Sequence, residues 1–280
     1  MKVVKSAIHV CPSELLNPVH PIRVNLIGSG GTGSHMLTAL SVINESLIEL
    51  NHPGLMVYLF DGDKIEGANK GRLLFSKREI GLYKSVVFIN RVNRHFGTCW
   101  KAFTEEFNGD TDMNLVKAEF TISCVDSVPA RFEIAKVLKK ASGSYGYLGR
   151  PCYWMDFGNS RDSGQVFLST VKPLKQPDSK RFDMVGELPM VTDEFRDLLL
   201  GSTEGAQLPS CSLFDALGKQ NLFINSSLVQ MGASLLWELF REGFISNRGF
   251  FLNLKNLQSQ PVAIRAPMVV VKKRTGRVAA

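Results

Sequence analysis

The chain has 280 residues, 44% of them hydrophobic and 21% charged, which is the composition of a globular protein with a sizeable core. Lys and Arg number 33 against 26 Asp and Glu, so the net charge is +7. No apolar run approaches the roughly 18 residues of a membrane span, and the N-terminus lacks the apolar segment of a signal peptide. We therefore expect a cytoplasmic protein that does not enter membranes.

The cysteines argue against both a disulfide framework and a structural zinc site. Such frameworks and sites use closely spaced cysteine pairs, and no CxxC pair occurs in this chain. We expect a reducing compartment and no zinc. The cysteines are Cys11, Cys99, Cys124, Cys152 and Cys211.

In the first half of the chain, apolar strand patterns alternate with helical patterns. Residues 1–21 contain Pro12, Pro18 and Pro21 and are expected to be irregular. The elements expected next are a strand over Ile22–Ile27, a helix over Thr32–Glu49, a strand over Met56–Phe60, a helix over Leu82–His95, a strand near Cys99–Phe107, a strand over Phe120–Val125 and a helix over Pro129–Lys139. This alternation predicts an α/β fold with a Rossmann-like, mainly parallel, doubly wound sheet.

The second half is less regular. The elements expected there are strands over Cys152–Phe157 and Gln165–Val171, a helix over Asn225–Phe240, and short strands over Gly249–Leu254 and Val262–Ile264. Residues 172–210 are rich in Pro, Asp, Lys and Gly, and a long irregular segment of this kind is usually functional, so we expect a crossing loop there. We expect one domain over 22–264, with mixed strands on its C-terminal side.

Much of the positive charge lies in the last residues, 265–280. This basic tail is most simply a solvated chain end, and binding to nucleic acid is the alternative. Its basic residues are Arg265, Lys272, Lys273, Arg274 and Arg277.

A glycine-rich turn, GSGGTG, follows the first strand of the expected sheet. Glycine permits a tight turn and a close approach of the backbone to phosphate, and the N–H groups at the start of the next helix attract an anion. The pattern predicts a nucleotide site, with a tight turn that binds no ligand as the alternative. The glycines are Gly28, Gly30, Gly31 and Gly33.

Asp61 stands at the tip of the second expected strand, where a carboxylate can accept hydrogen bonds from a ribose. It follows Gly33 by 28 residues, against about 20 in dehydrogenases, which counts against a nicotinamide cofactor. Arg72 and Lys84 come next, and two cations near a phosphate turn suit a triphosphate better than a redox dinucleotide. Ordinary surface charge is the alternative for either residue.

Asp126 follows the strand pattern TISCV and is itself followed by Ser127 and Arg131. A carboxylate at the carboxyl end of a central strand lies in the ligand crevice of such a sheet and can bind Mg²⁺. The alternative for Asp126 is an N-cap of the helix that begins near Pro129.

Four motifs in order carry a family resemblance: GSGGTG, DGDKIEGANKGRLLF, IGLYK and CVDS-xxx-R. Together they resemble the ThiF/MoeB/HesA family of ubiquitin-activating-like enzymes, and within it the ThiF-related member of the bacterial PRTRC cassette. The resemblance covers about residues 22–171 and extends more loosely over 205–240. It implies a homodimer that uses MgATP to adenylate the C-terminal carboxylate of a small ubiquitin-like, β-grasp protein.

The resemblance also implies roles for individual residues. The glycines line the phosphate turn, Asp61 takes the ribose, and Asp126 binds Mg²⁺. Lys84 neutralises charge as pyrophosphate leaves. The residues implied in nucleotide binding are Gly28, Gly30, Gly31, Gly33, Asp61, Asn69, Arg72, Lys84, Asp126 and Ser127, and those implied in catalysis are Arg72, Lys84, Asp126 and Cys211.

Cys211, in LPSCSLFDAL, is the candidate to capture the activated carboxyl as a thioester or an acyl-disulfide, and an incidental buried cysteine is the alternative. The chain also departs from the family. It lacks the paired CxxC motifs that bind zinc in many members, and residues 1–21 show no counterpart of the basic helix that reaches the nucleotide of the partner subunit. An inactive nucleotide-binding adaptor and an NAD(P)-dependent oxidoreductase therefore remain alternative functions.

Overall fold

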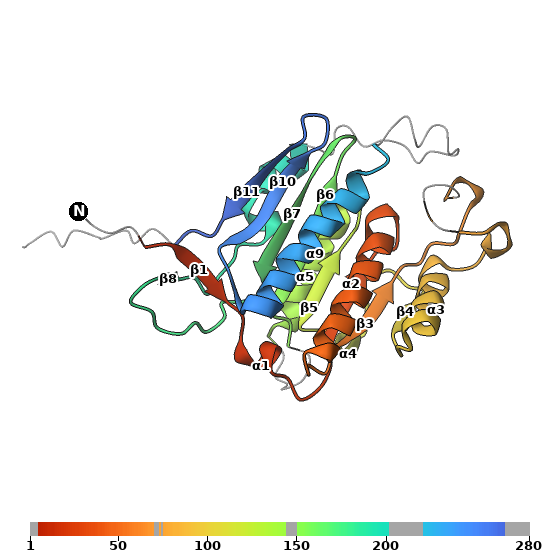
Figure 1. The fold of residues 1–280 in the computed structure, drawn as a ribbon. Coiled ribbons are helices and arrows are strands. Elements are labelled where there is room, and N and C mark those ends of the chain that lie inside the picture. The colour runs from red at the N-terminus through yellow and green to blue at the C-terminus, as the bar shows by residue number, and fades with distance from the viewer. Residues whose placement is uncertain (1–4, 70–72, 74, 144–149, 202–220, 267–280) are drawn as a thin grey trace, which may run out of the picture.

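A computed structural model describes residues 5–69, 73, 75–143, 150–201 and 221–266 (Figure 1). Within these residues, the main sheet has eight strands in the order β11-β10-β7-β6-β5-β2-β3-β4. The parallel strands are β2 (Ile22–Ile27), β3 (Leu55–Phe60), β4 (Lys101–Phe103), β5 (Phe120–Ser123) and β6 (Tyr153–Asn159). The antiparallel strands are β7 (Ser163–Thr170), β10 (Asn247–Asn253) and β11 (Gln258–Ala263).

Helices cover both faces of the sheet. One face carries α2 (Gly31–Glu49), α3 (Lys84–Phe96) and α9 (Ile224–Glu242), of which α2 and α9 lie in front of the strands in Figure 1. The other face carries α4 (Met113–Val116), α5 (Val128–Ala141), α6 (Val191–Glu194) and α7 (Arg196–Gly201). The prediction of a mainly parallel, doubly wound sheet with mixed C-terminal strands is confirmed.

The central strands are apolar on both faces because both faces are buried. In β3, for example, Val57 and Leu59 pack under α2 and α3, whereas Tyr58 and Phe60 face the opposite layer. The order of the strands reverses between β2 and β5, since β3 and β4 follow on one side and β6 on the other. In open α/β sheets, this switch point is where ligands bind.

The expectation that residues 1–21 are irregular is wrong for two short elements, β1 (Ala7–Val10) and α1 (Ser13–Leu16). β1 pairs with β8 (Asp183–Met184) and with β9 (Phe244–Ile245) in a small second sheet. Proline restricts its own residue and the one before it, so Pro12 only separates the strand from the helix. The strand forms because distant parts of the chain supply both of its partners.

The described part of the crossing segment, 172–201, is anchored to the domain at both ends. β8 joins it to β1, and at the other end the buried Arg248 of β10 forms an ion pair with Glu194 and donates to the Pro189 carbonyl at 3.1 Å. Burial lowers the pKa of Arg248 to about 10, so it stays charged at neutral pH. Residues 202–210 of the expected loop lie outside the described residues.

None of the helices within the described ranges combines the length and the apolar character that crossing a membrane requires.

His9 of β1 connects the small sheet to the main one. Its ring is fully buried, with Nδ1 donating to the Val185 carbonyl at 2.6 Å and Nε2 accepting from the Tyr153 hydroxyl at 2.7 Å. Burial lowers the pKa of this imidazole below its ordinary 6.5, and the bond to Val185 opposes that shift. The folded protein therefore holds His9 neutral at pH values where the unfolded chain protonates it.

This difference predicts a loss of stability in acid. Below pH 6.5 the unfolded state binds a proton that the native His9 does not, so the advantage of the wild type over His9→Gln should shrink as the pH falls, by up to about 1.4 kcal/mol per pH unit. Urea unfolding at pH 7.5 and 5.5 measures this difference, with the exposed His95→Gln as the matched control. A difference between wild type and His9→Gln that stays constant with pH contradicts the assignment.

Candidate functional site

A cavity of about 580 Å³ opens at the carboxyl ends of the parallel strands, next to the switch point between β2 and β5. This volume lies within the usual range of small-molecule sites. Arg72 and Cys211 are outside the described residues, and Gly33 packs behind the turn. The cavity is lined by most of the residues expected from the sequence: Gly28, Gly30, Gly31, Asp61, Asn69, Lys84, Asp126 and Ser127.

Two of the glycines are required by close packing. Gly28 has a φ of +87°, and a Cβ there would lie 2.9 Å from the Cys124 carbonyl oxygen of the neighbouring chain segment. A Cβ at Gly33 would overlap the carbonyl oxygen of Gly28. Because Gly28 and Gly33 have no Cβ atoms, the start of α2 can approach the end of β2. No side chain caps α2, and Gly31 and Thr32 of its first turn line the cavity, so this end is suited to an anion.

Asp61 is held against the glycine turn. Its Oδ2 accepts from the backbone N–H of Ser29 at 2.6 Å and from the Ser29 hydroxyl at 2.7 Å, while Oδ1 accepts from the Asp63 N–H at 2.8 Å. A carboxylate has about four lone-pair positions, so Asp61 retains capacity for a ligand hydroxyl.

Lys84, the first residue of α3, brings a positive charge to the cavity. Its ammonium contacts the Asp63 carboxylate at 2.7 Å, and the Lys84 side chain is 10% exposed against 73% for Asp63. Asn69 stands nearby in a short 3₁₀ turn, where its side-chain oxygen accepts from the Glu66 N–H at 2.8 Å. The structure therefore places both residues on the cavity wall but also gives each a partner within the chain.

Asp126 differs from Asp61 and Asp63, which have partners within the chain. It is exposed, and its carboxylate takes part in no hydrogen bond or ion pair with any residue of the described ranges. The N-cap of α5 is its neighbour Ser127, whose hydroxyl accepts from the Ala130 N–H at 3.2 Å. The capping alternative for Asp126 is wrong, and the Asp126 carboxylate is available to a ligand.

Two asparagines were missed by the sequence analysis. The side-chain oxygen of Asn225, in the first turn of α9, accepts from the Thr32 hydroxyl at 3.0 Å and from the amide of Asn159. Its amide also lies over Gly31, where a Cβ would collide with it. Asn225 thus joins α9 to the glycine turn and to β6. A polar residue at a helix start is too common to be recognised as part of a site.

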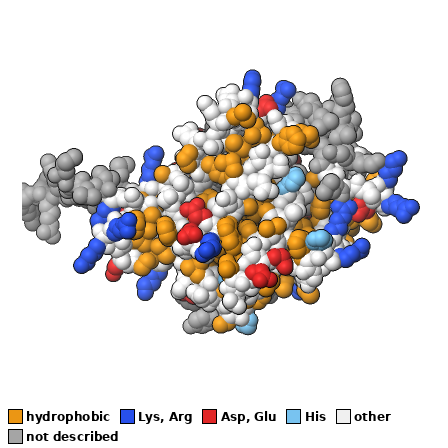
Figure 2. Space-filling model, in the orientation of Figure 1, with side chains coloured by type: hydrophobic (Ala, Val, Ile, Leu, Met, Phe, Trp, Pro, Cys, Tyr) orange, Lys and Arg blue, Asp and Glu red, His pale blue; other side chains and the backbone are white. Residues whose placement is uncertain are grey.

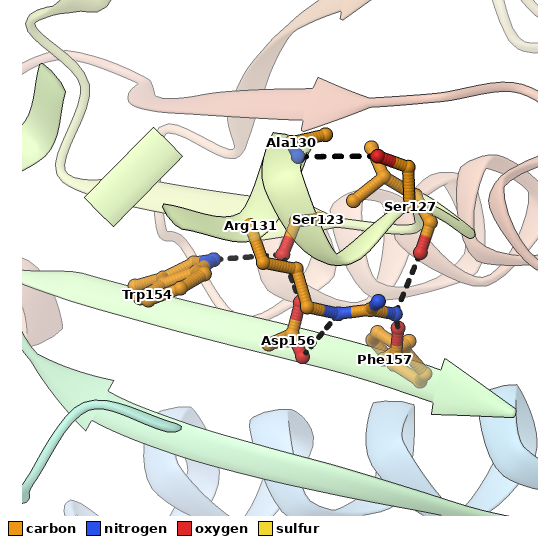
Figure 3. Close-up of polar contacts among 8 residues, drawn as sticks. Ser123, Ser127, Ala130, Arg131, Trp154, Asp156 and Phe157 are labelled. Carbon is orange, nitrogen blue, oxygen red and sulfur yellow. Dashed lines mark hydrogen bonds and ion pairs between the residues drawn. The ribbon is translucent and has the colours of Figure 1, made fainter. Parts of the chain in front are cut away.

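A buried charge pair lies beside the cavity (Figure 3). Nε of Arg131 donates to the two oxygens of Asp156 at 3.2 and 3.1 Å, and the Ser123 hydroxyl donates to Asp156 at 2.6 Å. Burial raises the pKa of Asp156, while Arg131 and Ser123 oppose that shift. Arg131 belongs to the motif CVDS-xxx-R, but no role for it was predicted from the sequence. Asp156 was not predicted at all, because its only signal is one acid within a buried strand.

Three of the described cysteines, Cys11, Cys124 and Cys152, are poor nucleophiles. Cys124 lines the cavity, but burial, together with the nearby negative charge of Asp156, raises the pKa of this thiol well above its usual range. Burial likewise raises the pKa values of Cys11 and Cys152 to about 12. A thiol that stays protonated at neutral pH is a weak nucleophile.

No group of three or more His, Cys, Asp or Glu among the described residues is arranged to hold a metal ion by itself. The cavity does contain carboxylates from separate segments, those of Asp61, Asp63, Glu106 and Asp126. Mg²⁺ is usually bound by one or two carboxylates together with substrate phosphates and water, so these oxygen donors fit a magnesium ion shared with a ligand.

Comparison with solved structures shows relatives of the same fold. E. coli MccB with MccA superimposes with a TM-score of 0.58 at 15% identity, over 92% of this chain and 67% of MccB. PaaA gives a TM-score of 0.57 at 14% identity, over 90% of this chain and 75% of PaaA. E. coli MccB with ATP gives 0.50 at 15% identity, over 91% and 67% of the two chains.

The sequence comparisons establish the family. A search among curated proteins found no match. The model of the ThiF family matches residues 6–265, a range that contains the glycine turn, Asp61, Lys84 and Asp126. Since this range is nearly the whole chain and the fold agrees with it, the protein belongs to the ThiF family.

Proposed function

We propose that the protein adenylates the C-terminal carboxylate of a small ubiquitin-like, β-grasp protein, using MgATP and releasing pyrophosphate. The observation that carries the proposal is one cavity, at the switch point of a ThiF-family sheet, that joins an uncapped helix start to Lys84 and the free carboxylate of Asp126. The resemblance also suggests a cytoplasmic protein of the PRTRC type.

In this proposal the glycine turn and the start of α2 hold the phosphates, and Asp61 accepts from the ribose. The carrier carboxylate attacks the α-phosphorus of ATP, the bond from that phosphorus to the β-phosphate oxygen breaks, and pyrophosphate leaves. Lys84 exchanges its partner Asp63 for the departing phosphates, which fits a lysine placed by a flexible stem. Asn69 and Arg72 contact the phosphates, and Ser127 fixes the loop that carries Asp126.

The chemistry agrees with the residues that line the cavity. The attacking carboxylate is already anionic, so the reaction needs positioning and charge stabilisation rather than a general base. Among the described cavity residues, four acids face one lysine, an arrangement that repels a bare triphosphate. Asp126 would hold Mg²⁺, which would supply the missing positive charge on the phosphates.

Asp126→Ala should reduce ATP–pyrophosphate exchange by about a hundredfold or more, because it removes the free carboxylate proposed to hold the metal. Exchange is measured with a β-grasp carrier encoded in the same operon. The matched control is Asp193→Ala, since Asp193 is an exposed acid paired with Lys139 outside the cavity. ATP binding without exchange in the wild type indicates an inactive adaptor, and NADH binding in place of ATP indicates an oxidoreductase.

Transfer of the activated carboxyl to Cys211 is a further step of the proposal. The thiolate would attack the acyl-adenylate carbonyl, and AMP would leave as a thioester forms. Cys211→Ala should then abolish the thiol-sensitive carrier adduct seen by mass spectrometry and leave exchange intact. Cys124→Ala is the control, because the Cys124 thiol lines the cavity with a raised pKa. An adduct that survives Cys211→Ala excludes the step.

Homodimerisation completes the proposal. Hydrophobic side chains lie among a few charged ones on the face formed by α2 and α9 (Figure 2), and Val42 and Ile48 of α2 are 57% and 49% exposed. Exposed apolar surface of this kind is typical of an interface. Val42→Glu should therefore convert a dimer to a monomer in light scattering, whereas Val19→Glu, at another exposed valine, should not.

A further inference from the structure

We propose that Arg131, held by Asp156, is a positioning residue that sets the place of the Asp126 carboxylate in the cavity. The inference rests on the proposed use of MgATP. Arg131 acts through the backbone and touches no ligand.

The guanidinium of Arg131 joins the ends of two strands. Nη2 of Arg131 donates to the carbonyl of Val125 at 2.6 Å. It also donates to the carbonyl of Phe157 at 2.9 Å (Figure 3). The first carbonyl belongs to the segment that follows β5, and the second belongs to β6. One nitrogen therefore links the two strands through both of its protons.

The link made by Arg131 lies where the backbones of β5 and β6 separate. The parallel pairing of β5 with β6 ends at Ser123 and Asp156. Beyond that point the chain after β5 turns away into α5, while β6 continues, and the cavity opens between them. The guanidinium replaces the missing sheet hydrogen bonds where the two backbones separate. Val125 and Phe157, whose carbonyls it holds, both line the cavity.

The position of Asp126 is set by the backbone on either side of it. Because its carboxylate has no partner in the described part of the chain, its position depends on the backbone on either side. On one side Arg131 holds the carbonyl of Val125, and on the other the hydroxyl of Ser127 caps α5. Asp126 thus stands between two anchored residues, free at its charged end.

The buried pair of Arg131 and Asp156 provides a rigid geometry that apolar residues would not. Arg131 is 4% exposed and Asp156 is 1% exposed. A buried ion pair adds little stability compared with apolar residues of the same size, so stability alone does not account for it. The pair does supply a rigid, planar fork. Asp156 orients that fork through Nε, and the Ser123 hydroxyl, which also accepts from the Trp154 indole N–H at 2.7 Å, orients Asp156.

The test measures Mg²⁺-dependent binding of a non-hydrolysable ATP analogue by calorimetry. Arg131→Lys keeps the charge but lacks the fork, so it should raise the Mg²⁺ concentration for half-maximal binding by about tenfold, as loss of an outer-shell partner does at metal sites. Analogue binding in EDTA should change less than about twofold. Ser123→Ala, which loosens Asp156, should shift the Mg²⁺ requirement in the same direction by a smaller factor and decides the question if Arg131→Lys does not fold.

The control is Val137→Ala, a buried change on the same helix, away from the cavity, that lowers stability without touching the charge pair. The inference is wrong if Val137→Ala produces the same shift, or if Arg131→Lys weakens binding equally with Mg²⁺ and with EDTA. If the wild type binds no MgATP, the proposed function fails and this inference fails with it. If the wild type binds and exchanges while Arg131→Lys keeps the normal Mg²⁺ requirement, only this inference fails.

Discussion

Glycine at positions 28 and 33 removes the two side chains that would hold α2 away from the end of β2. With no Cβ at either position, the helix start, the strand end and the Cys124 carbonyl of the neighbouring segment come into direct backbone contact. This contact places the uncapped N–H groups of α2 at the edge of the sheet, next to the switch point. The cavity is built around the start of α2, and a single methyl group at Gly33 would displace this helix start.

Some charged groups of the cavity are held by neighbouring residues, whereas the Asp126 carboxylate is free. Asp61 is bound to the glycine turn, and Lys84 is paired with Asp63, so both are in place before a ligand arrives. The carboxylate of Asp126 has no partner among the described residues, and it follows a backbone segment whose Val125 carbonyl is held by Arg131. Preorganised charges together with a carboxylate left open to a ligand are what a reaction that depends on electrostatic stabilisation requires.

Sequence patterns succeeded where structure is local. Apolar periodicity predicted the strand over 22–27, a strand over 120–125 that the structure ends at Ser123, and the helices behind them. The cavity residues Gly28, Asp61 and Asp126 follow from their places at strand ends. The patterns failed where partners are distant. β1 is a strand because β8 and β9 lie beside it, and a short apolar run among prolines carries no sign of those partners.

The sequence by itself determined the alternation of the main strands and helices, the glycine turn and the membership of the ThiF family, because each of these depends on motifs and their spacing along the chain. Only the tertiary structure decided which residues meet. Asn225 bonds to Thr32 of the glycine turn, 193 positions away, and Asp156 becomes the partner of Arg131 through the register of β5 with β6. These contacts depend on how the helices and strands pack together, and packing joins residues that are far apart in the sequence and share no local pattern.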